Sequence, residues 1–268
     1  MALVIQMTTI IQTAKGAERA HHGGSEMKIE GATALVTGAN RGIGKAFAEE
    51  LLARGAAKVY AGVRDVSTVT DSRLVPVQLD VTVPERIAEV AAELTDVDLV
   101  VNNAGTGRPA LPLAATLEDA RFELELNYLS LISMTQAFAP VLADNGGGAI
   151  VNMLSIVSFV GSPNLSTYSA SKAAAWSYTN SSRVQLKLQG TEVVGVHVGY
   201  VDTDLIASFD VDKIQPNLVP TAAFDALEAG QPEALVDDWT REVKAGLSDD
   251  QNLIYPGVEE QFNAAVAS

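Results

Sequence analysis

The stretch ATALVTGANRGIG, residues 32–44, decides the fold of this chain. Its first half, ATALVT, is an apolar run of the length and type of a buried strand. KAFAEELLARG (45–55) follows, with apolar residues at helical spacing and a glycine that would end the helix. Gly38, Gly42 and Gly44 stand between the two elements. A strand, a glycine-rich turn and a helix in this order predict a backbone that can approach a pyrophosphate at the helix N-terminus.

Other glycine motifs fit this turn less well. A P-loop has Ser or Thr after its Gly-Lys pair, whereas Ala46 follows Lys45 here. The glycine order also differs from G-x-G-x-x-G, so the common dinucleotide fingerprint is not strictly matched. Because strand, turn and helix all fall in place, we still interpret the turn as a cofactor cradle.

Beyond the turn, short apolar runs alternate with longer helical patterns. Strands that are apolar on both faces and separated by helical crossovers form a parallel sheet covered on both sides. We therefore predict one α/β domain over residues 27–268, a doubly wound parallel sheet of about seven strands with helices on both faces. The runs that predict strands are 32–37, 58–63, 75–81, 98–105, 148–154 and 191–199. The later helical patterns are 117–139, 221–230 and 232–247.

The composition excludes several classes of function. The formal net charge of −15 gives a field that repels nucleic acid and anionic membranes, and no apolar run reaches the roughly 18 residues of a membrane span. Without cysteine there is no disulfide or thiolate, and His197 is the one histidine inside the expected fold, so we expect no metal site. Residues 1–26 resemble no secretory signal, and a tag, an upstream mis-start and a disordered extension all remain open. We expect a cytoplasmic protein.

TYSASK, residues 167–172, is the clearest candidate for chemistry. Tyr168 and Lys172 are four apart and share one face of a helix. A neutral phenol is a poor proton shuttle at neutral pH, but a nearby ammonium stabilises the phenolate and lowers the pKa of the tyrosine. A single Y-x-x-x-K can equally be an ordinary pair on an exposed helix, so the rest of the chain has to decide.

The end of the second strand discriminates between the two nicotinamide dinucleotides. An acidic residue there binds the ribose 2′-hydroxyl of NAD, and an arginine binds the 2′-phosphate of NADP. Arg64 occupies this place and Arg41 lies in the glycine turn, so the sequence favours NADP(H). Asp65 could pair with Arg64, which leaves NAD(H) possible.

Several motifs in this order resemble the short-chain dehydrogenase/reductase family over about residues 28–203. They are TGANRGIG (37–44), LDVT (79–82), NNAG (102–105), Asn127, Ser155, YSASK (168–172) and GYVDT (199–203). The resemblance implies a Rossmann-like fold and an oxidoreductase that acts on CH–OH and C=O groups. One position departs from the family, because Val198 stands where proline is usual before Gly199. We interpret His197 beside it as a packed core residue.

The resemblance also implies residue roles. Tyr168 would be the general acid in reduction and the base in oxidation, and Lys172 would lower its pKa and bind the nicotinamide ribose. Ser155 would hold the substrate oxygen, and Asn127 would help to position a water that relays protons behind Lys172. The positions expected to contact the cofactor are Gly38, Asn40, Arg41, Gly42, Ile43, Gly44, Arg64, Asp80, Val81, Asn102, Asn103, Ala104, Gly105, Tyr168, Lys172, Gly199, Val201 and Thr203.

Two other classes of function fit the sequence less well. A dinucleotide-binding regulator or scaffold without turnover would not need Tyr168, Lys172 and Ser155, so it is the alternative and not the preferred reading. A serine hydrolase would need a G-x-S-x-G elbow and a suitable histidine, and the chain has neither.

The substrate and the oligomeric state are less constrained. Segment 204–220 is predicted to be a lid whose apolar residues either line the substrate pocket, favouring an uncharged hydrophobic ketone, aldehyde or alcohol, or simply seal the core. These apolar residues are Leu205, Ile206, Phe209, Ile214 and Leu218, with Phe159 and Tyr200 as further candidates for the lining. By resemblance we expect a homodimer or homotetramer formed through helices 117–139 and 166–188. The candidate packing face is Leu131, Met134, Ala137 and Phe138.

Overall fold

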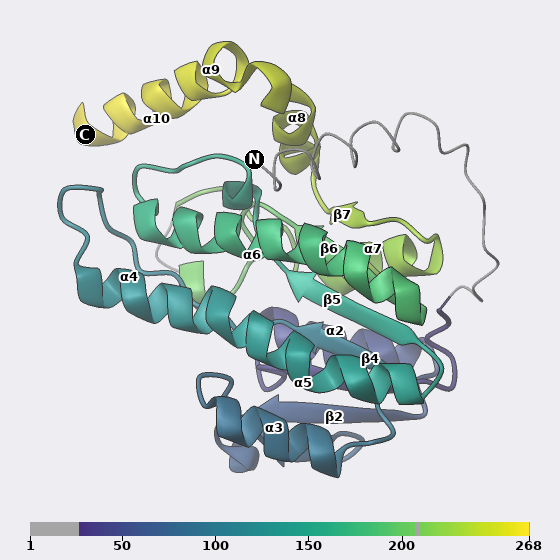
Figure 1. The fold of residues 1–268 in the computed structure, drawn as a ribbon. Coiled ribbons are helices and arrows are strands. Elements are labelled where there is room, and N and C mark those ends of the chain that lie inside the picture. The colour runs from purple at the N-terminus through teal and green to yellow at the C-terminus, as the bar shows by residue number, and fades with distance from the viewer. Residues whose placement is uncertain (1–26, 207–209, 268) are drawn as a thin grey trace, which may run out of the picture.

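The computed structural model describes residues 27–206 and 210–267 and contains one seven-stranded sheet. All strand pairs are parallel, and the strand order is β3-β2-β1-β4-β5-β6-β7. The strands are β1 (Thr33–Thr37), β2 (Lys58–Val63), β3 (Val75–Gln78), β4 (Leu99–Asn102), β5 (Gly148–Met153), β6 (Thr191–His197) and β7 (Glu233–Leu235). The predicted doubly wound parallel sheet is confirmed (Figure 1).

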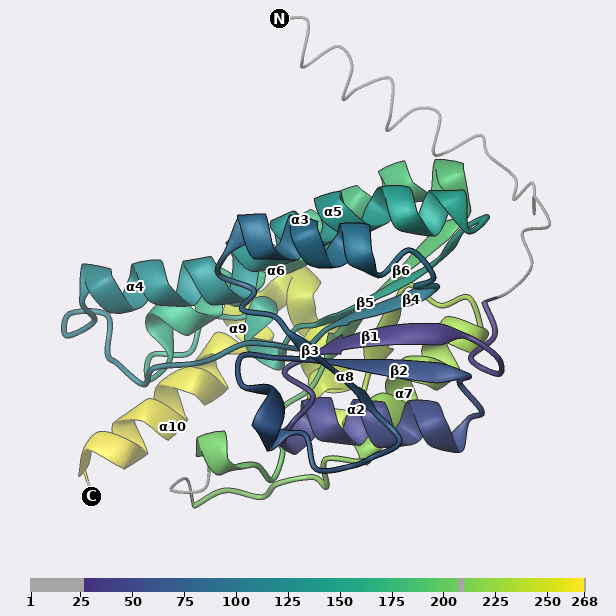
Figure 2. The ribbon, with the colours of Figure 1, turned by 90° about the horizontal axis from the view of Figure 1, so that it is seen from below.

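Helices cover both faces of the sheet. One face carries α3, α5 and α6, and the opposite face carries α2 and α7 (Figure 2). These helices are α2 (Gly42–Ala53), α3 (Pro84–Glu93), α5 (Ser130–Asp144), α6 (Ser166–Leu186) and α7 (Leu218–Glu228). The remaining helices are α4 (Leu117–Leu124), α8 (Asp238–Gly246), α9 (Asp250–Leu253) and α10 (Tyr255–Ala267).

A hydrophobic core lies on each side of the sheet. On the α2 and α7 side, the fully buried rings of Phe47 and Phe224 meet edge to face with centroids 5.5 Å apart. On the other side, Met134 and Phe138 of α5 pack against Leu35 and its neighbours in the sheet. Each such side chain contributes about 2 to 3 kcal/mol of burial free energy. The central strands are therefore apolar on both faces, as their sequences predict.

The helical run Leu117–Asp144, which comprises α4, a π-helical turn (η2, Glu125–Leu129) and α5, is long and apolar enough to cross a membrane by length and composition alone. Three of its apolar residues, Met134, Phe138 and Leu142, are fully buried against the sheet.

Two predictions about secondary structure and packing were wrong. The segment 232–247 is not helical throughout, because Glu233–Leu235 pairs with β6 as edge strand β7 before α8 begins. Three residues are too few to show strand periodicity, and the pairing with β6 decides their conformation. The proposed intersubunit face was also wrong: Leu131, Met134 and Phe138 are buried in the chain's own core, and Ala137 packs against it.

Part of segment 204–220, which is predicted to be a lid, packs in the core of the domain. Helix α7 begins at Leu218, and Val219 and Pro220 are buried in it. The Ile214 side chain packs against the core, and its backbone forms an isolated β-bridge with Val201. Ile206 lies in a short 3-10 turn (η5, Asp204–Ile206) and lines the large cavity described below. The side chains of Leu205 and Phe209 lie outside the described part of the structure.

The strand order reverses direction between β1 and β4. Connections from the two strands diverge to opposite sides there, which leaves a crevice beyond the carboxyl ends of the strands. The glycine turn after β1 and the NNAG segment after β4 both open into this crevice.

Candidate functional site

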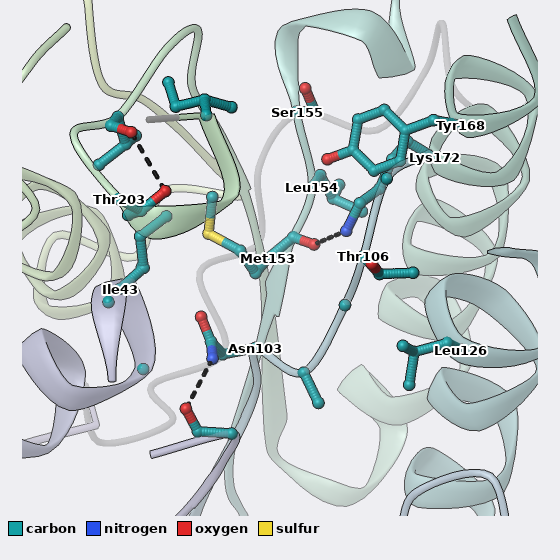
Figure 3. Close-up of a pocket in the computed structure, with 18 of the residues that line it drawn as sticks. Ile43, Asn103, Thr106, Leu126, Met153, Leu154, Ser155, Tyr168, Lys172 and Thr203 are labelled. Carbon is teal, nitrogen blue, oxygen red and sulfur yellow. Dashed lines mark hydrogen bonds between the residues drawn. The ribbon is translucent and has the colours of Figure 1, made fainter. Parts of the chain in front are cut away.

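A cavity of about 740 Å³ occupies the crevice at the carboxyl ends of the strands (Figure 3). This volume is in the range that holds cofactor-sized ligands. Its walls come from the glycine turn, from the ends of β2 to β6 and from α6 and the C-terminal helix α10. The predicted positions that line it are Gly38, Asn40, Arg41, Gly42, Ile43, Gly44, Arg64, Asp80, Val81, Asn103, Ala104, Gly105, Ser155, Tyr168, Lys172, Gly199, Val201 and Thr203.

The glycine turn is shaped by its missing side chains. Gly38 has a φ of +68°, a conformation that L side chains rarely adopt. A Cβ on Gly44 would lie 2.1 Å from the Gly38 carbonyl oxygen, so the start of α2 can approach the end of β1 only with glycine there. Arg41, at the N-cap of α2, caps no helical amide with its side chain. The first amides of α2 therefore face the cavity as donors for an anion.

The NNAG segment splits into two parts. Asn103 joins the strand ends, because its Nδ2 donates to the Thr37 carbonyl oxygen at 2.9 Å and its amide donates to the Thr37 hydroxyl at 2.9 Å. Asn102 points the other way, and its Nδ2 donates to Asn152 Oδ1 at 2.9 Å. Asn102, expected to contact the cofactor, therefore lies outside the lining of the large cavity. Side chains alternate along a strand, and Asn102 ends β4 on the buried side.

The cations expected near the adenosine end are in place. Arg64 follows β2 and lines the cavity. The predicted Arg64–Asp65 pair is absent from the described residues, because Asp65 accepts hydrogen bonds from the amide and hydroxyl of Ser67, at 3.0 and 2.7 Å. Arg41 pairs with Asp204 across the cavity mouth at 3.2 Å, and both side chains are mostly exposed. Arg64 is thus the cation at this end whose charge is not offset by a neighbouring carboxylate among the described residues.

Tyr168, Lys172 and Ser155 lie together on one side of the cavity, opposite Ile43 and Thr203 (Figure 3). Tyr168 and Lys172 project from the same face of α6, as their spacing predicts. The Lys172 ammonium lies 5.8 Å from the centroid of the Tyr168 ring and donates to the Met153 carbonyl oxygen at 2.8 Å. Ser155 is the N-cap of a 3-10 turn (η3, Ile156–Ser158) directly after β5.

Burial governs the protonation of this pair. It raises the pKa of Tyr168 to about 12, although the nearby Ser155 hydroxyl acts in the opposite direction and the Glu123 carboxylate adds to the rise. It also lowers the pKa of Lys172 to about 8. The pKa of Tyr168 is therefore shifted in the direction opposite to the one expected from the sequence, because desolvation of the phenolate is its largest cause. At neutral pH the phenol carries its proton.

Asn127 lies in the π-helical turn η2, a distortion that is frequent at functional sites. Its Oδ1 accepts from the Thr106 amide at 2.9 Å, and its Nδ2 donates to the Thr106 carbonyl oxygen at 2.8 Å and to the Ser171 hydroxyl at 2.9 Å. Asn127 thus fixes the segment that follows NNAG to α6. It lines, with Lys172, a separate cavity of about 10 Å³, close to the volume that one water molecule needs.

The Val198–Gly199 departure is compensated by the C-terminal region. The Gly199 amide donates to Asp237 Oδ2 at 2.8 Å, and Asp237 is itself the N-cap of α8. A Cβ on Gly199 would come within 2.9 Å of the Trp239 ring, which stacks at 5.7 Å on Tyr200. Contacts with α8 therefore hold the loop that carries Gly199. In the family this loop is usually stiffened by a proline at the position of Val198.

Part of the cavity wall was not predicted from the sequence. Trp239, Val258, Gln261 and Phe262 line it from α8 and α10. Val258 and Phe262 are an i,i+4 apolar pair, a signal that could have identified the inward face of α10. Tyr200 lines the cavity as expected, but Phe159 does not and instead stacks on His197 at 4.1 Å.

These residues fit a nicotinamide dinucleotide. The glycine turn leaves no room for a Cβ at Gly44 and presents free helix amides where a pyrophosphate would lie. Arg64 stands at the adenosine end, and the Tyr168–Lys172 side lies across the cavity. One cavity is lined by both groups of residues, so it connects the two ends.

Comparisons with known proteins agree with this geometry. The short chain dehydrogenase family model matches residues 32–213. A 3-oxoacyl-[acyl-carrier-protein] reductase of Synechocystis sp. is 31% identical over 214 residues, 75% of this chain and 84% of the relative.

Two solved structures resemble the chain and contain cofactor. A short chain dehydrogenase from Burkholderia cenocepacia in complex with NADP has a TM-score of 0.83 at 40% identity, covering 87% of this chain and 99% of that one. A 3-ketoacyl-(acyl-carrier-protein) reductase from Brucella melitensis complexed with NADH has a TM-score of 0.71 at 26% identity, covering 77% and 96%. The chain therefore belongs to the short-chain dehydrogenase/reductase family, oxidoreductases that transfer hydride between a nicotinamide dinucleotide and an alcohol or carbonyl group.

Proposed function

We propose that this chain is an NADP(H)-dependent reductase or dehydrogenase of an uncharged, hydrophobic ketone, aldehyde or alcohol, and that Tyr168 is its general acid and base. The proposal rests on one observation. Tyr168, Lys172 and Ser155 lie together on one wall of the cavity, and the glycine turn forms the opposite wall. A regulator or scaffold without turnover has no use for this arrangement and is not favoured.

The three residues have complementary roles in the proposal. A nicotinamide dinucleotide, when bound, supplies or accepts the hydride, which leaves one proton for the protein to manage. Tyr168 is protonated at neutral pH because burial raises its pKa to about 12, so its hydroxyl donates the proton to a carbonyl oxygen in reduction. Ser155, whose hydroxyl lies beside that of Tyr168, orients the same oxygen. Lys172 places a cation at the cavity wall and makes the charged form of the tyrosine less costly in oxidation.

Asn127 completes the proposed proton path. It lines the small cavity behind Lys172 together with Asn102 and Ser130. A water of the size that this cavity admits would have the Lys172 ammonium and amide oxygens as partners. The Oδ1 atom of Asn102 is buried there and has no hydrogen-bond partner among the described residues.

The preference for NADP(H) rests on Arg64. Its guanidinium follows β2, where the adenosine ribose would lie, and the neighbouring Asp65 is engaged by Ser67. Arg41 is a second cation near the same end, although Asp204 pairs with it. NAD(H) is the second cofactor that we propose to test, because one of the similar solved structures is complexed with NADH.

We expect Arg64→Asp to raise the KM for NADPH by about 10- to 100-fold and to change the KM for NADH by much less, because an acidic side chain repels the 2′-phosphate and accepts from the 2′-hydroxyl. Initial rates with each cofactor measure both values. Arg73→Asp is a matched control, because Arg73 is exposed and paired with Asp71 in the loop before β3 and does not line the cavity. Equal changes for NADPH and NADH in Arg64→Asp would contradict the role of Arg64.

The substrate class is inferred from the part of the cavity beyond Tyr168. Many of the residues that line it are apolar, namely Pro109, Phe122, Leu126, Val157, Leu165, Ile206, Val258 and Phe262, and Asn164 and Gln261 are polar residues of the same lining. Such a lining favours substrates with a hydrophobic body around one carbonyl or hydroxyl group. The relatives named above act on 3-oxoacyl groups carried by a protein, so thioesters of 3-oxoacids belong in any test.

The experiment that tests the proposal is a panel of ketones, aldehydes, alcohols and 3-oxoacyl thioesters, each assayed with NADPH or NADP and with NADH or NAD. Turnover of hydrophobic carbonyl compounds with NADPH supports it. A preference for charged or sugar-like compounds contradicts the substrate class, and a preference for NADH contradicts the cofactor assignment.

We also propose a cytoplasmic homodimer or homotetramer. The helices expected at the interface expose apolar side chains that the core does not use. These are Leu117, Leu124 and Leu129 on α4 and η2, and Val184 and Leu188 at the end of α6 and just beyond it. Sedimentation equilibrium gives the oligomeric state, and cell fractionation gives the location.

A further inference from the structure

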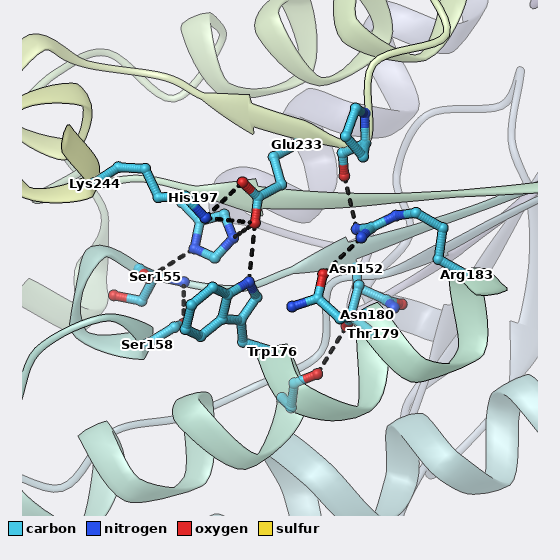
Figure 4. A network of polar contacts seen from close by, with 12 residues as sticks. Asn152, Ser155, Ser158, Trp176, Thr179, Asn180, Arg183, His197, Glu233 and Lys244 are labelled. Carbon is cyan, nitrogen blue, oxygen red and sulfur yellow. Dashed lines mark hydrogen bonds and ion pairs between the residues drawn. The ribbon is translucent and has the colours of Figure 1, made fainter. Parts of the chain in front are cut away.

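A partly buried polar cluster lies close to Ser155 (Figure 4), and none of its members lines the large cavity. Its centre is Glu233 of edge strand β7. The Trp176 indole donates to Glu233 Oε1 at 2.9 Å, and the Lys244 ammonium of α8 lies 2.7 Å from Oε2. His197 of β6, which is fully buried, brings its Nε2 to 3.7 Å from Oε1. We name these four residues the Glu233 cluster.

The Glu233 carboxylate is ionised and is held by several partners. Burial would raise the pKa of Glu233, but contacts with His197, Lys244 and Trp176 outweigh it and hold the pKa at about 2. The carboxylate is therefore charged at neutral pH. The Lys244 ammonium also lies 4.5 Å from the Phe159 ring centroid and 4.7 Å from that of Trp176, so aromatic faces enclose the ion pair.

His197 connects the cluster to Ser155. Its Nδ1 lies 3.1 Å from the Ser155 carbonyl oxygen, and since that oxygen can only accept, Nδ1 carries a proton. The same carbonyl oxygen accepts from the Ser158 amide at 3.0 Å, and the Ser155 amide donates to the Ser158 hydroxyl at 3.1 Å. The backbone of Ser155 is thus held by Ser158 and His197 at the point where β5 has ended. The Phe159 ring stacks on the imidazole and fixes its plane.

Trp176 connects the cluster to α6. It lies four residues after Lys172 and eight after Tyr168, so all three side chains project from one side of the helix. The hydrogen bond from the indole N–H therefore links α6, the helix that carries Tyr168, to Glu233. Glu233 thus holds the Tyr168 helix through Trp176. His197 holds the Ser155 carbonyl oxygen through Nδ1, and its Nε2, 3.7 Å from the same carboxylate, has no hydrogen-bond partner among the described residues.

We propose that Glu233 and His197 are positioning residues that fix the Ser155 hydroxyl relative to the Tyr168 hydroxyl. The inference rests on the function proposed above, in which both hydroxyls contact one substrate oxygen. Neither Glu233 nor His197 lines the large cavity, so they act through Ser155 and α6 and not on the substrate. A displacement of about 1 Å between catalytic groups lowers rates by about 10²-fold.

Substitutions at His197 give the first test. His197→Leu removes the donor to the Ser155 carbonyl oxygen, and we expect kcat to fall by about 10- to 100-fold with the Kd for the cofactor unchanged. His197→Asn places an amide N–H near the position of Nδ1, and we expect it to restore most of kcat. Steady-state kinetics give kcat, and quenching of protein fluorescence by NADPH gives Kd. Wild-type kcat in His197→Leu, or equal kcat in the Leu and Asn variants, would overturn the proposal.

Trp176→Phe tests the other connection and does not depend on His197→Leu folding. It removes the indole N–H but keeps an aromatic ring, and we expect a decrease in kcat of about 10-fold. Because both substitutions disturb the separation of the same two hydroxyls, those of Ser155 and Tyr168, the His197→Leu/Trp176→Phe double variant should lose less than the product of the two single effects. Wild-type kcat in Trp176→Phe would remove Glu233 from the positioning role.

A matched control separates positioning from stability. Thr179 is fully buried on α6, donates to the Ala175 carbonyl oxygen and accepts from Asn152, and no hydrogen bond joins it to the cluster among the described residues. Thr179→Val should lower the thermal midpoint about as much as the cluster variants but leave kcat near wild type. If kcat falls equally, loss of stability explains all the variants and the proposal fails.

If the wild-type chain turns over no substrate of the panel, the proposed function fails and the positioning role fails with it. If Tyr168→Phe abolishes turnover while His197→Leu does not lower it, the positioning role alone fails.

Discussion

Tyr168→Phe is expected to lower kcat by about 10³- to 10⁴-fold, the upper part of the range that general acid–base groups contribute. The substitution removes one hydroxyl and keeps the ring, which packs against Gly107 in the cavity wall. In reduction the carbonyl oxygen then has no positioned proton donor, and the Ser155 hydroxyl, whose pKa is far too high, cannot replace the phenol. The Kd for the cofactor and the thermal midpoint should stay near their wild-type values. Single-turnover and steady-state rates with the best substrate of the panel give the loss.

The control for Tyr168→Phe is the same substitution ten residues along α6. Tyr178 is half-buried and does not line the cavity, so Tyr178→Phe should keep kcat within about 2-fold of wild type. If Tyr168→Phe retains more than about a tenth of wild-type kcat, Tyr168 is not the proton donor. If instead it loses cofactor binding in parallel with kcat, the tyrosine acts in binding and not in proton transfer.

The parts of the site that the sequence predicted are those that local geometry determines. The glycine turn follows from three missing side chains, and the shared direction of Tyr168 and Lys172 follows from the pitch of one helix. The seven-stranded parallel sheet follows from alternating apolar runs and helices. Each of these features depends on residues close together in the chain, so one sequence is enough to predict them.

The parts that the sequence could not predict depend on contacts between distant segments. Strand β7 exists because β6 offers an open edge, and its three residues have no periodicity of their own. The wall formed by Trp239 and Phe262 depends on how α8 and α10 pack over the crevice. The pKa of Tyr168 depends on its burial, which no spacing rule gives, and burial reversed the expected direction of the shift.

Lys172→Met is expected to lower kcat by about 10²- to 10³-fold and, at the same time, to make the cofactor-free protein more stable. The ammonium is nearly fully buried, and burial lowers its pKa from the ordinary 10.5 to about 8. At pH 7 the folded state therefore holds a charge at a cost of about 3 kcal/mol. Methionine is similar in length and carries no charge, so it removes this cost but gives up the hydrogen bond to the Met153 carbonyl oxygen, worth about 1 kcal/mol. The expected net gain is about 1 to 2 kcal/mol.

The pH dependence of that gain has a definite sign. Between pH 8 and 10.5 the unfolded wild-type chain binds more protons at Lys172 than the folded chain, so wild-type stability rises with pH through this window. Below pH 8 the cost of burying the charge is fully present. The stability advantage of Lys172→Met should therefore be largest at pH 7 and should shrink as the pH rises towards 10.5. Urea unfolding of both proteins without cofactor, at pH 7 and pH 10, measures the difference.

Lys45→Met is the matched control for this experiment. Lys45 is exposed on α2 and pairs only with Glu49, at 3.7 Å, among the described residues, so its loss should change the free energy of unfolding by less than about 0.5 kcal/mol at either pH. Two results would contradict the account of Lys172: a variant less stable than wild type at pH 7, or an advantage that does not change between pH 7 and pH 10. A variant that is more stable but keeps wild-type kcat would leave the burial argument intact and remove Lys172 from the proposed chemistry. The combination of lost activity and gained stability is what distinguishes a charge retained for function from one retained for folding.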